Sequence, residues 1–238
     1  MISAVIHNKS SRWFSKSIEN HSNSDEKKIP REDEITSTIF GSMKYFNHLD
    51  VFKLFNSMCD EVDDRRCLSM NISLWPSLRI LKNKKRVEPD AVFSFTLDGG
   101  EVKKFILEAK WLNNEYNYNQ LENQWIAFGK NAPENTRLIY LATCIKNFNL
   151  YKKNINDKWR GITWSKFSSI LSKMKCNDKI TSEFFYDLHL MLEKFNFSPF
   201  TGFNHCLIKT EFKKFNLKII KFPSNLPKTI DIKWSIYD

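Results

Sequence analysis

The residues with the clearest chemical potential lie in one short segment, between Asp90 and Lys110. An apolar run at 91–96 follows Asp90, and a second apolar run ends just before Glu108. Asp-Gly-Gly at 98–100 separates the two runs, and a Gly-rich turn between such runs predicts a β-hairpin. We therefore expect two paired strands with charged residues at their open end.

The register of this hairpin decides whether the charged residues meet. With a three-residue turn, Asp90 lies opposite Glu108, and Val92 lies opposite Ile106. Lys110 shares the face of Glu108, because side chains alternate along a strand. A two-residue turn would send Asp90 to the other face. In the three-residue register the second face carries Ala91, Phe93 and Phe95 against Leu107, Phe105 and Lys103.

Such a cluster has a definite chemistry. Directly opposed side chains have Cβ atoms roughly 5 Å apart, and two carboxylates that close repel by roughly 3 kcal/mol at an effective dielectric of ~20. A divalent cation removes the repulsion, and Mg²⁺ is typically held by one or two carboxylates plus water and substrate phosphates. Lys110 would add positive charge beside the attacking water, which it could orient or help to deprotonate.

The alternative is a plain hairpin whose charged ends meet solvent. A Glu-x-Lys pattern carries no information alone, since it recurs at Glu26–Lys28, Glu101–Lys103 and Glu211–Lys213. Only Glu108–Lys110 ends an apolar strand that pairs with a strand opened by Pro-Asp.

Pro89-Asp90, a spacer and then Glu108-Ala109-Lys110 resemble the motif of the PD-(D/E)xK nuclease superfamily. The resemblance covers roughly 31–170. It implies an α/β, restriction-endonuclease-like core, a mixed central sheet of about four to five strands flanked by helices. It also implies metal-dependent hydrolysis of nucleic-acid phosphodiesters, with Asp90 and Glu108 as ligands of Mg²⁺, for which Mn²⁺ could substitute.

Many members of this superfamily place a glutamate on the first helix, pointing at the metal. Residues 31–41 read as an acidic-started helix with Ile35 and Ile39 on one stripe. Glu34 is the position that we carry over, although Glu32 or Asp33 could take its place. The acids could also simply favour a helix N-terminus through its dipole.

Many members also carry a glutamine on the helix after the Glu-x-Lys strand. Residues 117–127 read as that helix, and Gln120 and Gln124 share one face because they are four residues apart. Gln120 is our candidate, with Gln124 behind it, and two solvated glutamines are the alternative. The Gln-x-x-x-Tyr pattern of one subgroup is not completed, because residue 124 is Gln.

The remaining elements and the domain limits follow from periodicity. We expect strands at 136–144 and 160–164, and helices at 42–58, at 165–174 with Ser165 as a possible N-cap, and at 181–195 with Thr181 or Ser182 as cap. The predicted organisation is a polar N-terminal arm at 1–30, a nuclease core at 31–170 and a mainly helical C-terminal extension at 171–238 that packs on the core.

The net charge of +10 and the pI near 9.3 point to a polyanionic partner. Basic residues gather immediately before the Pro-Asp strand and again near 146–160, and ordinary solubilising lysines are the alternative. The acidic run at 60–64 is expected in an exposed loop and is not favoured as a ligand site. The predicted nucleic-acid contacts are Lys82, Lys84, Lys85, Arg86, Lys152 and Lys153.

Other function classes lack support. The five cysteines form no Cys-x-x-Cys pair, and they and the histidines are scattered, which argues against a disulfide frame and a zinc site. No stretch approaches 18 apolar residues and no signal peptide is recognisable, so we expect a cytoplasmic protein without a membrane partner.

The sequence thus predicts a Mg²⁺-dependent deoxyribonuclease, more specifically an endonuclease. A DNA-binding or assembly subunit that does not cleave, and a nuclease for RNA or DNA ends, stay open as alternatives. Members of the superfamily serve restriction, phage defence, transposition or repair. Many of them work as homodimers or with an ATPase partner.

Overall fold

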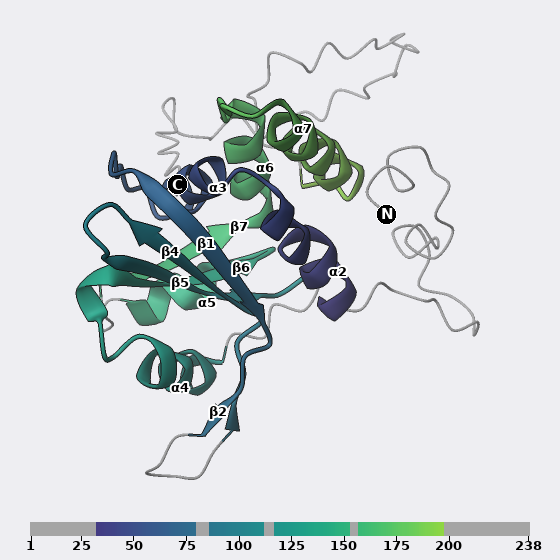
Figure 1. Ribbon diagram of the computed structural model, residues 1–238. Helices are drawn as coiled ribbons and strands as arrows, with labels where there is room; N and C mark the ends of the chain where they lie inside the picture. The colour runs from purple at the N-terminus through teal and green to yellow at the C-terminus, as the bar shows by residue number, and fades with distance from the viewer. Residues whose placement is uncertain (1–31, 80–85, 112–116, 153–156, 198–238) are drawn as a thin grey trace, which may run out of the picture. The chain divides into compact units, whose positions relative to one another are not determined.

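A five-stranded mixed sheet forms the centre of the computed structural model (Figure 1). The structure describes residues 32–79, 86–111, 117–152 and 157–197, with the backbone alone for 150–152. Spatial order in the sheet is β1 (Cys67–Leu74), β4 (Ala91–Leu97), β5 (Val102–Ala109), β6 (Thr136–Ala142) and β7 (Trp159–Thr163). The first three strands pair antiparallel and the last three parallel. The predicted α/β class with a mixed central sheet is therefore confirmed.

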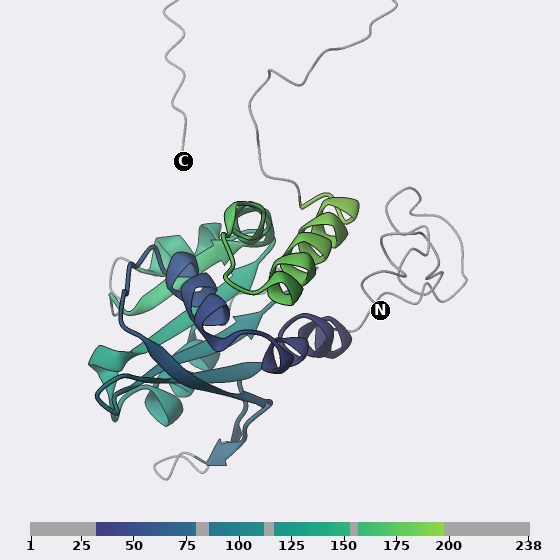
Figure 2. The same ribbon diagram turned by 45° about the horizontal axis from the view of Figure 1, so that its top comes forward.

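Helices cover both faces of this sheet, as Figures 1 and 2 show. One face packs against α2 (Glu32–Ile39), the 3₁₀ turn η1 (Gly41–Tyr45), α3 (His48–Met58), α6 (Trp164–Lys173) and α7 (Lys179–Lys194). The other face packs against α4 (Tyr118–Phe128) and α5 (Lys146–Lys152), and a 3₁₀ turn η2 (Pro133–Asn135) precedes β6. Buried strands with helices on both sides explain the continuous apolar run of β6.

The β4–β5 hairpin has the predicted register. Val92 pairs with Ile106 and Phe93 with Phe105, and the turn is the expected Asp98-Gly99-Gly100. Gly99 and Gly100 have φ angles of 88° and 82°, a left-handed conformation that glycine adopts without strain. Ala91, Phe93, Phe95, Phe105, Leu107 and Lys103 are all buried on one face, as predicted.

Several local predictions are wrong. The N-cap of α6 is Thr163 rather than Ser165, and the N-cap of α7 is Asp178 rather than Thr181 or Ser182. The helix expected at 42–58 is interrupted at 46–47, where Asn47 caps α3. These starts differ because the side chain that reaches a free N–H, rather than the residue type alone, decides where a helix begins.

A small two-stranded ribbon joins β1 to β4. Its strands are β2 (Leu78–Arg79) and β3 (Arg86–Val87), and it extends away from the central sheet beside α4 (Figure 1). None of the described helices is both long and apolar enough to cross a membrane. The predicted N-terminal arm, 1–30, and the part of the C-terminal extension after residue 197 lie outside the described residues.

Candidate active site

Asp90 lies immediately before β4, at the open end of the hairpin. Continuing the register by one pair beyond Ala91 and Leu107 sets Asp90 opposite Glu108. The backbone N–H of Ala109 donates a 2.6 Å hydrogen bond to Asp90 Oδ2, which fixes the carboxylate against β5. The predicted convergence of these two acids therefore follows from the strand pairing.

Glu108 is almost fully buried and is held by two glutamines from α4. Gln120 Nε2 donates to Glu108 Oε1 at 2.7 Å, and Gln124 Nε2 donates to Glu108 Oε2 at 2.6 Å. Asn117 caps α4 and so sets the rotation that turns both glutamines toward β5. The structure thus brings Gln120 and Gln124 to the acid, and the alternative of two solvated glutamines is wrong.

Lys110 completes the cluster from the residue after β5. Its Nζ lies 2.8 Å from Glu108 Oε1 and 3.6 Å from Glu32 Oε2. Its backbone is fixed on both sides, since Lys110 N–H donates to Leu141 O and Trp164 Nε1 donates to Lys110 O. The ammonium group is therefore held at the acids by the sheet and by α6.

The first helix reaches this cluster through Glu32. Besides its contact with Lys110, Glu32 Oε1 accepts a 3.1 Å hydrogen bond from the backbone N–H of Trp111. Glu32 was one of the two alternatives to Glu34, and it lies in the first turn of α2. Glu34, half-buried on the same helix, stays a prediction as a metal ligand.

Burial and crowding change the protonation of this cluster. Burial, and then the Glu108 carboxylate, raise the pKa of Asp90 from 3.8 to about 7. Burial alone would lower the pKa of Lys110, but Glu108, Glu32 and Asp90 outweigh it and raise that pKa. Lys110 therefore keeps its proton, which suits orienting or stabilising a substrate better than removing a proton.

The oxygen atoms leave room for a cation. Glu108 Oε1 already accepts from Gln120 and Lys110, whereas Oε2 accepts only from Gln124 and keeps a lone pair. Among the described residues, Asp90 Oδ1 has no hydrogen-bond donor. Carboxylate oxygen atoms are the ligands that Mg²⁺ and Mn²⁺ prefer, so the free Asp90 Oδ1 and the remaining lone pair of Glu108 Oε2 fit such a cation.

The number of protein ligands is nevertheless small. Across the described ranges, no group of three His, Cys, Asp or Glu side chains is arranged to hold a metal ion. A cation between Asp90 and Glu108 would therefore complete its shell with water or substrate oxygen atoms, which Mg²⁺ commonly does.

No family model, curated protein or solved structure matches this chain. The relation to the PD-(D/E)xK superfamily therefore rests on the resemblance of the motif residues Pro89, Asp90, Glu108 and Lys110.

Most of the predicted nucleic-acid contacts lie outside the residues that the structure describes. Lys82, Lys84, Lys85 and Lys153, together with the side chain of Lys152, lie outside the described residues. Arg86 is described, on β3, where it donates to Ser77 Oγ and pairs with Glu88 at 2.7 Å. The ribbon that carries Arg86 leads directly into Asp90, and Trp75 N–H at its other end donates to Asp90 O.

Two tryptophans that support the site were not predicted. Trp111 packs edge-to-face against Trp164 with ring centroids 4.9 Å apart, and Trp164 also holds the backbone of Lys110. Trp111 comes directly after the Glu-x-Lys motif, which is a signal for a supporting role, but its partner is 53 positions away in α6 and could not be identified from spacing.

Asp90→Asn should stabilise the metal-free protein. A raised folded-state pKa gives stability that is complete below the unfolded value near 4 and is lost as pH rises through about 7. Asn mimics the protonated acid at every pH, so its advantage should grow from pH 4 to pH 7, to at most about 4 kcal/mol. Urea unfolding of wild type and Asp90→Asn in EDTA at pH 4, 5.5 and 8 measures this difference. Equal unfolding free energies of the two proteins at pH 8 would contradict the raised pKa of Asp90.

Proposed function

We propose that the protein is a metal-dependent nuclease that hydrolyses DNA phosphodiester bonds, acting as an endonuclease. The observation that carries the proposal is the meeting of Asp90, Glu108 and Lys110 at the open end of the β4–β5 hairpin. Asp90 and Glu108 would hold Mg²⁺. The cation would supply charge that offsets the carboxylates and the charge that builds on a phosphate under attack.

The chain's own residues prepare this chemistry. Gln120 and Gln124 fix both oxygens of Glu108, and the Ala109 N–H fixes Asp90, so neither carboxylate must reorganise when substrate arrives. Lys110 keeps its proton and presents an ammonium group beside the acids, where it can donate to an attacking water or to a phosphate oxygen. The net charge of +10 supports a polyanionic substrate.

Incubation with supercoiled plasmid tests the proposal. We expect relaxed or linear products with Mg²⁺ or Mn²⁺, none with EDTA, and none from the Asp90→Asn variant under any of these conditions. Comparison with linear DNA and with RNA separates an endonuclease for DNA from an enzyme for ends or for RNA. Products from Asp90→Asn at the wild-type rate would refute the assigned site.

A second candidate is a DNA-binding subunit that does not cleave. One observation favours it: amide and ammonium groups already contact both oxygens of Glu108. Gel-shift binding of DNA that is equal with and without Mg²⁺, and no cleavage with either metal, would support this candidate over the nuclease.

A further inference from the structure

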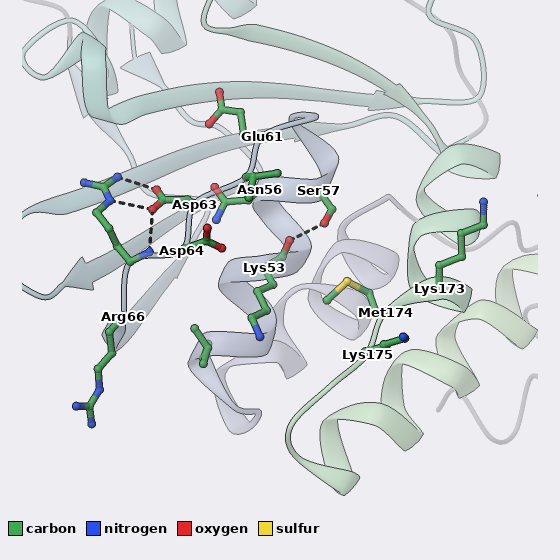
Figure 3. Close-up of a pocket in the computed structure, with 13 residues that line it drawn as sticks. Lys53, Asn56, Ser57, Glu61, Asp63, Asp64, Arg66, Lys173, Met174 and Lys175 are labelled. Carbon is green, nitrogen blue, oxygen red and sulfur yellow. Dashed lines mark hydrogen bonds and ion pairs between the residues drawn. The ribbon is translucent and has the colours of Figure 1, made fainter.

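A pocket of about 600 Å³ lies away from the active site, between α3, the segment 61–66 and the segment 173–175 (Figure 3). We call it the α3 pocket. It adjoins Lys103, which lies five positions before Glu108 on β5, or roughly 17 Å at about 3.4 Å per residue. The α3 pocket and the acids are therefore separate sites.

Asn56, in the wall of the α3 pocket, carries a hydrogen-bond donor that is unpaired within the described part of the chain. Asn56 is 3 % exposed, and its Oδ1 accepts a 2.7 Å hydrogen bond from Lys103 Nζ. An ammonium group can only donate, so this contact fixes the amide orientation and leaves Nδ2 on the other side. Asn56 lines the α3 pocket, and its buried Nδ2 has no hydrogen-bond partner among the described residues, so a ligand that reaches this amide should bring an acceptor.

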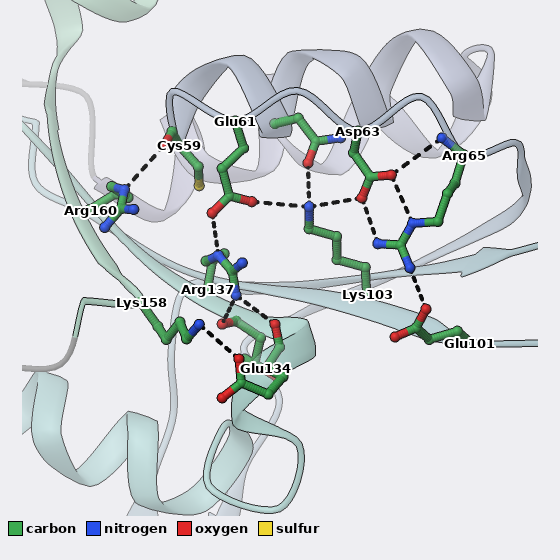
Figure 4. A network of polar contacts seen from close by, with 12 residues as sticks. Cys59, Glu61, Asp63, Arg65, Glu101, Lys103, Glu134, Arg137, Lys158 and Arg160 are labelled. Carbon is green, nitrogen blue, oxygen red and sulfur yellow. Dashed lines mark hydrogen bonds and ion pairs between the residues drawn. The ribbon is translucent and has the colours of Figure 1, made fainter.

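Basic side chains outside the pocket lining, together with Arg65, pair with two of the acids near the α3 pocket, Glu61 and Asp63. Figure 4 shows Glu61 and Asp63 turned toward Lys103, whose Nζ lies 3.0 Å from each. Arg137 also pairs with Glu61, and Arg65 pairs with Asp63 at 2.7 Å. This network corrects the expectation that the whole acidic run lies in an exposed loop.

The cations of the α3 pocket, by contrast, face solvent. Lys53, Arg66, Lys173 and Lys175 line it and are exposed, and within the described part of the chain they have no ion-pair partner. Asp64 is the acid that remains exposed in the lining. The pocket therefore combines an excess of positive charge with a buried donor, which suits an anion with several acceptor oxygens.

We propose that the α3 pocket binds the phosphate groups of a nucleotide-sized ligand, either a free nucleotide or part of a nucleic-acid strand. Phosphate oxygens can accept from the Asn56 amide and from several lysines at once. The volume is within the range of small-ligand sites, and Leu49 and Met174 offer apolar contact for a ring.

Titration calorimetry on the full chain in EDTA tests this proposal with three probes: adenosine diphosphate, adenosine and the oligonucleotide (dT)8. We expect a probe with phosphates to bind and adenosine not to bind. The variant with Lys53→Gln, Lys173→Gln and Lys175→Gln should bind at least about tenfold more weakly, and Asp64→Asn should bind more tightly. Lys130→Gln, an exposed lysine after α4, is the matched control and should bind like wild type.

Each outcome is decisive. Binding of adenosine diphosphate assigns the phosphates to a free nucleotide, and binding of (dT)8 alone assigns them to a strand, provided that the triple variant weakens either one. Binding of neither phosphate-bearing probe, or unchanged binding by the triple variant, overturns the proposal. Asp90→Asn should bind the probes like wild type, so a failure of the proposed nuclease activity would not affect this result.

Discussion

The Lys110→Met variant should cleave supercoiled DNA about 10²–10³-fold more slowly than wild type while still binding a divalent cation. Lys110 Nζ lies 2.8 Å from Glu108 and keeps its proton because three carboxylates surround it. Methionine keeps the apolar stem but removes the charge that would stabilise a phosphate under attack. Since the ammonium group repels a cation, its loss should leave Mn²⁺ binding equal or tighter.

Two further variants make this result specific. Asp90→Asn should lose both cleavage and Mn²⁺ binding, because it removes a ligand rather than a donor. Lys130→Met changes an exposed lysine and should cleave like wild type. Single-turnover cleavage and Mn²⁺ titration followed by electron paramagnetic resonance provide the two measurements. A Lys110→Met protein that cleaves within threefold of wild type would remove the lysine from the mechanism.

The largest effect on stability is expected for Lys103→Met, at about 3–5 kcal/mol of unfolding free energy at pH 7. Lys103 is only 5 % exposed, and its ammonium group contacts Asn56, Glu61 and Asp63. Methionine fills much of the same volume beside Phe105. The loss of unfolding free energy would therefore come chiefly from the carboxylates of Glu61 and Asp63, which would face one another without the ammonium group that they share.

The pH dependence gives a second signature of this network. The Arg65 hydrogen bond, opposed by burial and aided by Lys103, lowers the pKa of Asp63. Burial alone would raise the pKa of Glu61, but Arg137 and Lys103 outweigh it and lower that pKa. A lowered folded-state pKa gives stability that is complete above the unfolded value near 4 and is lost as pH falls further.

The stability difference between wild type and Lys103→Met should therefore shrink as the pH falls below 4. Urea unfolding of both proteins at pH 7, 4 and 3 measures it. Lys104→Met, on the opposite face of the same strand, is the control and should cost under about 1 kcal/mol, since Lys104 is half-buried and donates only a 3.4 Å bond to Phe128 O. A loss of unfolding free energy as small for Lys103→Met would contradict the stabilising role of the contacts of Lys103 with Asn56, Glu61 and Asp63.

The hairpin register could be predicted because its determinants are local. Two glycines set the turn, and the alternation of apolar side chains admits one register that buries Phe93 and Phe105 together. The position of Asp90 opposite Glu108 then follows without further information. The two glutamines of α4 could also be predicted from the sequence, because their four-residue spacing places them on one face of a helix whatever the tertiary context.

Features that depend on distant partners could not be predicted. Glu32 rather than Glu34 contacts Lys110, and the choice depends on how α2 is rotated against the sheet. Strand β1, by contrast, was missed although it carries a local signal, since apolar and polar residues alternate strictly from Leu68 to Leu74. The Lys103 network joins residues 40 and 42 positions apart, and the acidic residues alone resemble a solvated loop.

The support of Lys110 has a consequence for the timing of activity during synthesis. Its neighbour Trp111 is bound by Glu32 from near the start of the described chain and packs on Trp164 and Phe195 near its end. A nascent chain that has not yet released α6 and α7 from the ribosome lacks these supports. Under the proposed nuclease function, this dependence would keep unfinished copies harmless to the genome that encodes them.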